Sequence, residues 1–454
     1  MKKKWELSEN IDHSLMESLL LKEGEIIKKS PAKLVSLHKT SSGDFYVKKS
    51  RHASFIFRPQ KYWFKDCPAR WEWSVAQTAQ SLGVAVVDHL AICEVWSATG
   101  LQEDILITRA FNGKPLHLAA NVDPYSVMEF VNSCHRKGMV HGDLHSSNLL
   151  VNENTGELRL VDLKGVCFKQ KANFKKQKLD IAYLNINFPI PLSEDLLKLS
   201  NELRRKKMAD RSRRCLKDNR EFGQQIHGCS KWWVRKLLLE DSLNQVLEKP
   251  DEFCNGNSLI KDGRSCTVVE YADYVIKRYN LKKPLNLIKD LFRSTKAKRA
   301  FQLGYHLELV GVATPRVIAA AEYRLLGLAL RSYFVMEKIE EATDLSDEKN
   351  NSLLFIGRLA KIIGRMHAEG FVHRDLKASN VIVDSDGKPR LIDLDGVSFI
   401  GKVPARLAVS NLKRLERGLR GKSISSWANR ICFFRHYCCE SGFQPFELKN
   451  IEKH

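Results

Sequence analysis

The feature that most constrains this chain is an internal repeat. Residues 138–166 read GMVHGDLHSSNLLVNENTGELRLVDLKGV, and residues 370–397 read GFVHRDLKASNVIVDSDGKPRLIDLDGV. Each copy has an Asp two residues after a His, an Asn five residues later, and a second Asp before a Leu-x-Gly turn. A long self-similar stretch indicates one folding unit present twice. A chain of 454 residues is long enough for two domains with separate cores.

The repeat extends upstream to a lysine in each half. The segments GDFYVKKS at 43–50 and ADYVIKRYN at 272–280 are rich in aromatic and β-branched residues, which predicts strands. Lys48 and Lys277 lie within them. The lysine precedes the first Asp of the motif by 95 residues in the first half and by 98 in the second. The landmarks therefore recur in the same order at nearly the same spacing.

Helical segments recur between the landmarks. Residues 69–84 correspond to 297–315, and each segment ends near a Gly-Val pair. Residues 126–138 and 353–370 precede the two motifs, and both end at Gly, which is a common helix stop. The apolar residues of the last segment recur at i, i+3, i+4 and i+7, which predicts an amphipathic helix.

The boundary is predicted near residue 220, giving domains over 1–220 and 221–454. The basic run at 204–214 would belong to the join. Residues 230–250, SKWWVRKLLLEDSLNQVLEKP, are predicted to form a helix leading into the second domain.

The repeated motif contains the parts that phosphoryl transfer requires. In each copy the Asn and the second Asp would meet across a hairpin, where their oxygens suit a hard cation such as Mg²⁺. The first Asp would then be free to orient a hydroxyl and accept its proton, and the strand lysine offers charge to phosphates. The set comprises Lys48, Asp143, Asn148 and Asp162 in the first half, and Lys277, Asp375, Asn380 and Asp393 in the second.

HGDLHSSN…VDLKG and HRDLKASN…IDLDG resemble the catalytic and metal loops of the protein-kinase-like superfamily. They are most similar to those of the bacterial lipopolysaccharide kinases, which phosphorylate Kdo or heptose in the inner core. The resemblance covers most of the chain. It implies an α+β fold of two tandem kinase-like domains, each with a small antiparallel β-sheet N-lobe and a short, mainly helical C-lobe.

The resemblance also implies roles for individual residues, with ATP and Mg²⁺ as cofactors. Lys377 would neutralise charge on the transferring phosphate, Glu72 would pair with Lys48, and His141 and His373 would brace their loops. Adenine would lie near 105–113 and 333–341. The catalytic bases would be Asp143 and Asp375, the magnesium ligands Asn148, Asp162, Asn380 and Asp393, and the phosphate lysines Lys48 and Lys277.

Each half departs from the kinase pattern. Neither has GxGxxG before its lysine, so the candidates for a phosphate-covering turn are 41–44 and 261–265. Aligning the Gly-Val ends places Ala300 opposite Glu72, so the partner of Lys277 is missing or comes from elsewhere. Glu308 is two helical turns away in that alignment.

The two loops also differ from each other. The first half has His145 where the second has Lys377, and Lys164 where the second has Asp395.

The residues after the second motif bear on the class of substrate. There is no Ala-Pro-Glu motif, and 61 residues follow Asp393 in the 454-residue chain, which leaves little room for an activation segment. This favours a glycan or small-molecule acceptor over a protein. An aminoglycoside-type or choline-type kinase, an atypical kinase of the ribosome-assembly type, and a pseudokinase scaffold in one half remain alternatives.

The formal net charge of +21 predicts an anionic partner. The excess is concentrated in basic runs at 169–178, 204–214 and 412–422. An acceptor in an anionic layer, such as lipid A carrying Kdo or heptose, fits this charge best; nucleic acid is a weaker alternative. The 412–422 run, followed by Trp427, Phe433 and Phe434, would suit an interfacial helix or simple packing.

The sequence predicts a cytoplasmic protein that associates peripherally with the inner membrane. Acidic residues interrupt the apolar part of the N-terminus, so no secretory signal forms. The best apolar stretch, 317–336, contains three charged residues and predicts a buried helix or strand. The eleven cysteines are scattered without CxxC pairs, which favours buried thiols over zinc or disulfides.

Overall fold

The computed structural model describes residues 1–9, 11–52, 60–168, 174–254, 258–280, 294–325, 328–345 and 347–449. The chain divides into two compact units, Met1–Arg204 and Arg205–His454. This division lies within helix α5 (Glu194–Ser212), upstream of the predicted boundary near residue 220. Most of the basic 204–214 run is therefore helical. The first five residues of the 169–178 run lie outside the described residues.

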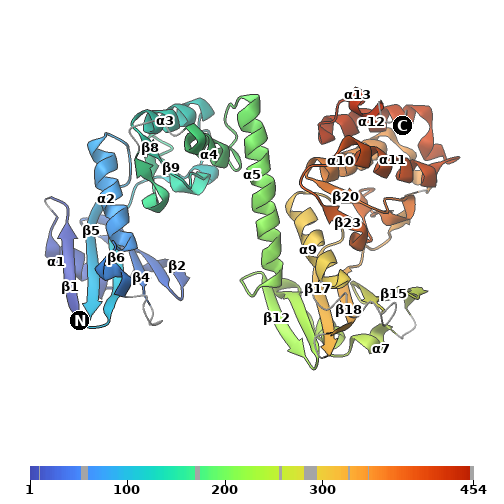
Figure 1. Ribbon diagram of the computed structural model, residues 1–454, viewed down its shortest axis with the longest axis horizontal. Helices are drawn as coiled ribbons and strands as arrows, with labels where there is room; N and C mark the ends of the chain where they lie inside the picture. The colour runs from blue at the N-terminus through green and yellow to red at the C-terminus, as the bar shows by residue number, and fades with distance from the viewer. Residues whose placement is uncertain are drawn as a thin grey trace. The chain divides into compact units, whose positions relative to one another are not determined.

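The first unit begins with a six-stranded antiparallel sheet in the order β1-β5-β6-β4-β3-β2 (Figure 1). Its strands are β1 (Lys2–Leu7), β2 (Glu25–Ser30), β3 (Lys33–Thr40), β4 (Gly43–Arg51), β5 (His89–Ser97) and β6 (Gly100–Arg109). Helix α1 (His13–Leu21) buries Met16 and Leu19 against Phe45 and Val47 of β4. Helix α2 (Pro68–Ser81) lies across the same lobe and contacts β5 and β6.

The second unit begins with a seven-stranded antiparallel sheet in the order β12-β13-β17-β18-β16-β15-β14. The strands are β12 (Phe222–His227), β13 (Ser230–Arg235), β14 (Leu259–Gly263), β15 (Cys266–Tyr271), β16 (Tyr274–Tyr279), β17 (Val317–Leu325) and β18 (Leu328–Glu337). Helices α6 (Asp241–Glu248), α7 (Pro250–Cys254) and α9 (Lys296–Leu309) belong to this lobe. Apart from β12, the strand order repeats that of the first unit.

The predicted helix over 230–250 is wrong for its first part and confirmed only over residues 241–248. Residues 230–235 form β13, which pairs with β12 and β17, and the helix begins only at Asp241. Trp232, Trp233 and Val234 are buried in succession, which is typical of a strand covered on both faces. Such a run has no periodicity that separates a strand from a helix.

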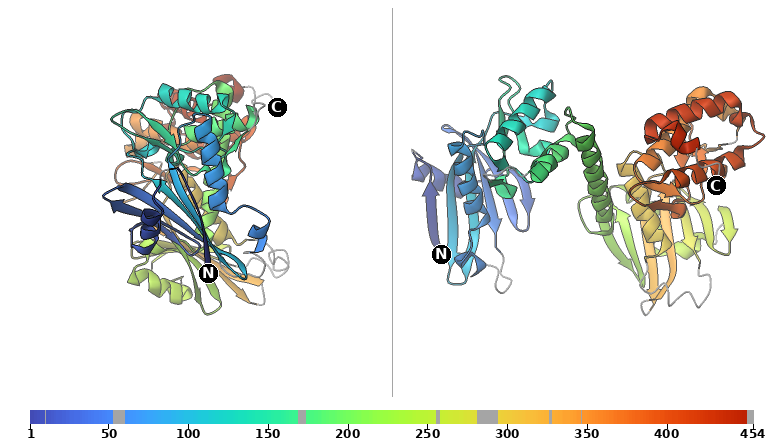
Figure 2. Two further views of the ribbon diagram at one scale, coloured as in Figure 1. Left: turned by 90° about the vertical axis from the view of Figure 1, so that its left-hand side faces the viewer. Right: turned by 45° about the horizontal axis from the view of Figure 1, so that its top comes forward.

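Each sheet is followed by small β-elements and a helical lobe (Figure 2). The first unit has β7 (Lys114–Pro115), α3 (Pro124–Arg136), β8 (Met139–Val140), β9 (Leu149–Val151), β10 (Leu158–Leu160), β11 (Cys167–Phe168) and α4 (Phe174–Asn185). The second has β19 (Thr343–Asp344), α10 (Leu353–Ala368), β20 (Phe371–His373), β21 (Val381–Val383), β22 (Pro389–Leu391), β23 (Val397–Phe399), α11 (Ala405–Leu419), α12 (Trp427–Ser441) and α13 (Pro445–Lys449).

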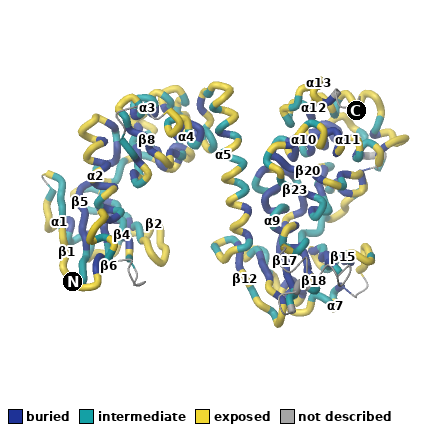
Figure 3. Tube along the Cα trace, in the orientation of Figure 1, coloured by how far each residue is buried: buried dark blue, intermediate teal, exposed yellow. Residues whose placement is uncertain are grey.

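The buried residues of each unit lie between the sheet and its helices and inside the helical lobe (Figure 3). Helix α10 buries Phe355, Leu359, Ile363 and Met366, the face that its periodicity predicts. The predicted α+β class, with antiparallel sheets and short helical lobes, is confirmed. Among the described helices, none is long and apolar enough to cross a membrane.

Candidate active site

In both units a hairpin brings the motif Asn next to the second Asp, as predicted. In the first unit, the Val161 N–H donates to the Asn148 carbonyl at 3.0 Å, and Asp162 follows directly. In the second, the Ile392 N–H donates to the Asn380 carbonyl at 3.0 Å, ahead of Asp393. The hairpins β9–β10 and β21–β22 thus place the Asn and the second Asp of each motif side by side.

The Asn side chains are oriented by the loops that carry the first Asp. The Asn148 amide nitrogen donates to the Asp143 carbonyl at 3.0 Å, and the Asn380 amide donates to the Asp375 carbonyl at 2.7 Å. Because the nitrogen is used in this way, the amide oxygen is left for a cation. An amide and a carboxylate, completed by substrate phosphates, suit Mg²⁺. No cluster of three or more His, Cys, Asp or Glu that could bind a metal occurs in the described parts of the chain.

Both metal-loop aspartates adopt the left-handed backbone conformation. Asp162 has φ 57° and ψ 61°, and Asp393 has φ 60° and ψ 52°. Among residues with a side chain, Asp and Asn tolerate this region best. Such backbone outliers concentrate at functional sites, where the surrounding structure maintains them.

In the first unit, Lys48 pairs with Glu72 as the resemblance implied. The Lys48 Nζ lies 3.0 Å from Glu72 Oε2 and 3.5 Å from Asp162 Oδ1. Glu72 extends from α2 and is almost fully buried. Burial opposes the charged lysine, but Glu72 and Asp162 outweigh it and raise the pKa of Lys48. The lysine is therefore held as a cation between the helix and the metal loop.

Helix α2 is tied to the metal loop a second time by Trp71, whose Nε1 donates to the Lys164 carbonyl at 3.1 Å. The neighbouring Trp73 is buried, with its Nε1 bonded to Glu6, whereas Trp71 is partly exposed.

In the second unit, the partner of Lys277 comes from the metal loop. Lys277 forms ion pairs with Asp393 and with Asp395, whose Oδ1 is 2.6 Å from the lysine Nζ. The Glu72 position is Ala300: the two residues are the fifth after the N-caps Cys67 and Thr295 of equally long helices. The alignment from sequence is therefore confirmed.

Glu308 serves a different purpose. It accepts from Arg235 Nη1 and from the Val317 N–H, each at 2.9 Å, and so holds β13 and β17 to α9.

The difference between the two motifs points to Asp395 as the partner of Lys277. Where the first unit has Glu72 on its helix and Lys164 in its loop, the second has Ala300 and Asp395. The acid that pairs with the lysine therefore comes from the helix in the first unit and from the loop in the second. Burial, together with a hydrogen bond to Asp393, raises the pKa of Asp395. Although burial acts in the opposite direction, Asp395 and Lys277 together lower the pKa of Asp393.

The two candidate bases are accessible. Asp143 is largely exposed, with His145 Nε2 at 3.9 Å from its Oδ2. Asp375 is half-exposed, and Lys377 Nζ lies 3.1 Å from its Oδ2. Either carboxylate can therefore meet a hydroxyl that approaches from solvent.

Buried side chains fix the loops from beneath. His141 and His373 each place Nε2 at 3.1 Å from the carbonyl preceding the metal Asp. Sequence reasoning missed Asp180 on α4, which accepts from the N–H groups of His141 and Gly142 at 2.7 and 2.9 Å. In the second unit, Asn411 on α11 accepts from the His373 N–H at 3.0 Å.

One of the two candidate phosphate-covering turns needs correction. Residues 261–265 form the turn between β14 and β15, the hairpin before the lysine strand β16. Residues 41–44 instead connect β3 to the lysine strand β4. The matching turn in the first unit is Pro31–Ala32, between β2 and β3.

The predicted adenine segments lie where the sheets end. Residues 105–113 cover the end of β6 and the connection to β7, and residues 333–341 cover the end of β18 and the residues after it. Their contact with adenine stays a prediction.

A lysine on a central sheet strand, followed by an Asp–Asn loop and an Asp in a tight turn, defines the protein-kinase-like class. Residues 261–437 match the family model described as the lipopolysaccharide kinase (Kdo/WaaP) family. This match confirms the resemblance over that part of the second unit.

Curated relatives and solved structures resemble the chain in part. It is 35% identical over 132 residues to a "3-deoxy-D-manno-octulosonic acid kinase" of Xanthomonas oryzae pv. oryzae. It is 37% identical over 132 residues to a protein of the same description from Stenotrophomonas maltophilia. Each match covers 28% of this chain and 50% of the relative, so the chain spans about half the length of the curated relatives it matches. "WaaP in complex with acyl carrier protein" matches with 18% identity and TM-score 0.36, over 48% of this chain and 98% of that one.

Proposed function

We propose that the chain is an ATP-dependent phosphotransferase that phosphorylates a sugar hydroxyl, of Kdo or heptose, in the lipopolysaccharide inner core. The observation that carries the proposal is the site of the second unit, which lies in the segment matching the lipopolysaccharide kinase family. Its relatives named as kinases of 3-deoxy-D-manno-octulosonic acid support a sugar acceptor.

The proposed mechanism assigns each residue a physical task. Asp143 or Asp375 orients the acceptor hydroxyl and takes its proton, because each carboxylate is exposed to an approaching hydroxyl. Lys377 adds positive charge next to Asp375, where negative charge develops on the phosphoryl group. Lys48 and Lys277 would hold phosphates of ATP.

Mg²⁺ would be held by Asn148 with Asp162, and by Asn380 with Asp393. When bound, it would neutralise phosphate charge during transfer. In the structure, the lysines pair with these same aspartates. The lysines must therefore shift towards phosphate when nucleotide and cation bind.

Peripheral contact with an anionic membrane surface is a further part of the proposal, and it would place the protein at the cytoplasmic face of the inner membrane. Trp427, Ile431 and Phe434 are 78%, 48% and 48% exposed and recur at i, i+4 and i+7 on α12. This spacing puts them on one helix face. We call these three residues the α12 stripe. Exposed bases of α11 and its C-terminal end lie nearby in sequence, namely Lys413, Arg417, Arg420 and Lys422.

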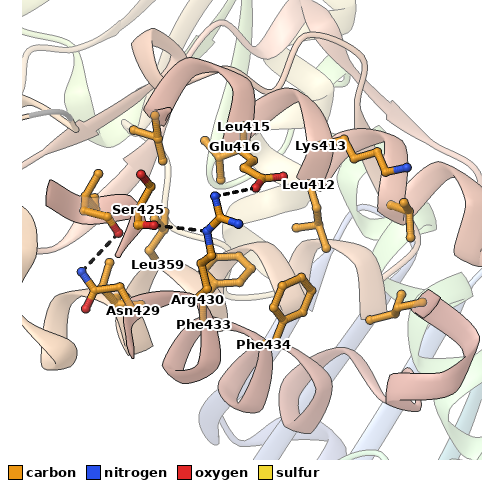
Figure 4. Close-up of a pocket in the computed structure, with 15 residues that line it drawn as sticks. Leu359, Leu412, Lys413, Leu415, Glu416, Ser425, Asn429, Arg430, Phe433 and Phe434 are labelled. Carbon is orange, nitrogen blue, oxygen red and sulfur yellow. Dashed lines mark hydrogen bonds and ion pairs between the residues drawn. The ribbon is translucent and has the colours of Figure 1, made fainter. Parts of the chain in front are cut away.

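The α12 stripe adjoins an apolar pocket of about 180 Å³ between α10, α11 and α12 (Figure 4). Phe434 lines it together with Phe433, Lys413 and Arg430. Arg430 is held by Glu416 at 2.9 Å and by the Ser425 carbonyl at 3.1 Å (Figure 4). Aromatic side chains combined with basic ones are the composition that favours an anionic lipid interface.

The proposed function is tested by transfer of label from γ-labelled ATP with magnesium. The acceptors are Kdo-lipid A, heptosylated lipid A, a generic protein, and none. Wild type is compared with Asp143→Ala, Asp375→Ala and the double variant. Label in a glycolipid that falls with each single change and disappears in the double variant means two working kinases.

The remaining outcomes are equally informative. Loss through only one change identifies the other unit as a non-catalytic scaffold. Label in protein alone favours an atypical protein kinase. No label in any glycolipid excludes the lipopolysaccharide assignment and leaves the kinase-like fold without its proposed acceptor.

A further inference from the structure

The metal loop of the first unit carries a lysine to which the proposed transfer reaction gives no task. Lys164 lies two residues after Asp162, and its Nζ is 3.2 Å from Asp162 Oδ1. Lys48 Nζ reaches the same oxygen at 3.5 Å. Two ammonium groups therefore converge on one oxygen of the carboxylate that would hold a divalent cation.

The backbone of Lys164 is held in place by helix α2. Trp71 Nε1 donates to the Lys164 carbonyl at 3.1 Å, and Lys164 lies within the short helical turn Leu163–Gly165. Its side chain is only 31% exposed. A charge held at this exposure interacts more strongly with its neighbours than a fully solvated one, because water and salt screen it less.

The second unit has the opposite charge at this position. Asp395 stands where the first unit has Lys164, and Lys277 pairs with both Asp393 and Asp395. Lys296 approaches Asp395 and not Asp393, at 3.9 Å. In the described parts of the second unit, Lys277 is the one base within ion-pair distance of Asp393. Two lysines thus share one carboxylate in the first unit, whereas one lysine pairs with two carboxylates in the second.

This difference changes how strongly each site attracts a divalent cation. A cation held by Asp162 would be repelled by the Lys164 ammonium, which contacts the same carboxylate. A cation held by Asp393 would instead be attracted by the additional charge of Asp395. The Lys164 ammonium also gives the first unit a second positive charge that phosphate oxygens can use.

We propose that Lys164 supplies at Asp162 the positive charge that a divalent cation supplies at Asp393. The first unit then binds the triphosphate of a nucleotide without a divalent cation, and the second unit binds it only with one. Asn148 and Asp162 can still take Mg²⁺ when it is present, but nucleotide binding does not depend on it. The two nucleotide sites are those of the proposed function, on which this difference rests.

The test is calorimetric titration of the full wild-type chain with a non-hydrolysable ATP analogue, in magnesium and in EDTA, at constant ionic strength. We expect two bound molecules per chain in magnesium and one in EDTA. In EDTA, Lys48→Met should abolish the remaining site, and Lys277→Met should leave it. The affinity of the first unit should differ by less than about threefold between the two buffers, and that of the second by at least about tenfold.

Three changes at Lys164 separate the effect of its charge from that of its size. Lys164→Gln should lower the affinity of the first unit in EDTA about tenfold or more, the effect of losing one charged contact, and should change it less in magnesium. Lys164→Asp, which copies the second unit, should have the larger effect, and Lys164→Arg should keep binding in EDTA. Lys49→Gln is the matched control, because it removes a base next to Lys48 on the opposite face of β4 and should leave both affinities unchanged.

Several results would overturn the inference. They are two bound molecules or none per wild-type chain in EDTA, and an unchanged affinity of Lys164→Gln in EDTA. The titration does not depend on label transfer. A chain whose first unit binds the analogue in EDTA but that transfers no label refutes the proposed function alone. A chain that transfers label but whose first unit binds the analogue only in magnesium refutes the role of Lys164 alone.

Discussion

At the scale of single residues, the two sites hold the same lysine with an acid from different elements. Glu72 reaches Lys48 from a helix, whereas Asp395 reaches Lys277 from the metal loop. In both cases the lysine remains charged despite burial, because the acid raises its pKa. The acid can therefore change its position in the chain while the electrostatic function is kept.

This equivalence predicts the effect of removing either acid. Glu72→Gln should weaken ATP binding to the first unit about tenfold, and Asp395→Asn should do the same in the second, since one hydrogen bond to a charged group contributes about 1.5–3 kcal/mol. ATP binding is measured in full chains whose other unit carries Lys48→Met or Lys277→Met. Glu308→Gln is the control in the second unit, because Glu308 bonds Arg235 and not Lys277. Unchanged affinity in Asp395→Asn would contradict the assignment.

The buried acceptor beneath the first catalytic loop gives another prediction. Asp180→Ala leaves the N–H groups of His141 and Gly142 unsatisfied and should cost about 2–4 kcal/mol of folding free energy. Asp180→Asn keeps one oxygen, as Asn411 does in the second unit, and should cost less. Hydrogen exchange over 139–148 measures the difference. Equal protection in Asp180→Ala and wild type would show that the loop does not depend on this side chain.

At the scale of elements, the helices of the second unit bury histidines in the neutral form. Burial, helped by Arg213, lowers the pKa of His306 on α9 to about 4. Burial also lowers the pKa of His367 on α10 to about 4, against a bond to Asn411. His306 contacts the rings of Phe371 and Phe399, which also contact each other. In the folded protein these two histidines therefore stay neutral at pH values where the same side chains in the unfolded chain would bind a proton.

The sign of the resulting pH dependence follows from proton counts. Above the ordinary histidine pKa of 6.5, these histidines are neutral in both the folded and the unfolded chain, and they cost no stability. As the pH falls from 6.5 towards 4, only the unfolded chain protonates them, so the free energy of unfolding decreases. Each histidine should lower the free energy of unfolding by about 2 kcal/mol when the pH is reduced from 7 to 5. His306→Phe should reduce the loss by that amount, while His227→Gln on β12 should not. Urea unfolding, followed by hydrogen exchange of α9 and α10, provides the measurement.

The α12 stripe leads to a prediction about membrane contact. Changing Trp427, Ile431 and Phe434 together to Ser should lower binding to vesicles containing anionic lipid at least tenfold, because each exposed apolar side chain can contribute about 1–3 kcal/mol when buried in lipid. The control is Ile226→Ser, which removes an exposed apolar side chain of β12. Co-sedimentation at low and high salt gives the result. Equal binding by the triple variant would remove α12 from the proposed interface.

At the scale of the whole molecule, each unit has its own strand lysine, proposed base, Asn and second Asp. The chain should therefore bind two molecules of a non-hydrolysable ATP analogue in the presence of magnesium. Lys48→Met and Lys277→Met should each lower this number to one, and the double variant to none. Calorimetric titration gives the stoichiometry. A wild-type value of one would identify the unit whose lysine variant changes nothing as the non-catalytic partner.

The amino-acid sequence was enough to predict the repeat, the lysine strands, the four helical segments and the hairpins that pair Asn with Asp, because these depend on local periodicity and short-range spacing. Only the folded structure showed which acid pairs with Lys277, which buried side chain supports each catalytic loop, and that residues 230–235 form a strand. Those outcomes depend on contacts between segments far apart in the chain, such as Lys277 with Asp395 and His141 with Asp180. No local pattern encodes such contacts, since they arise only when the sheet and the helices pack together.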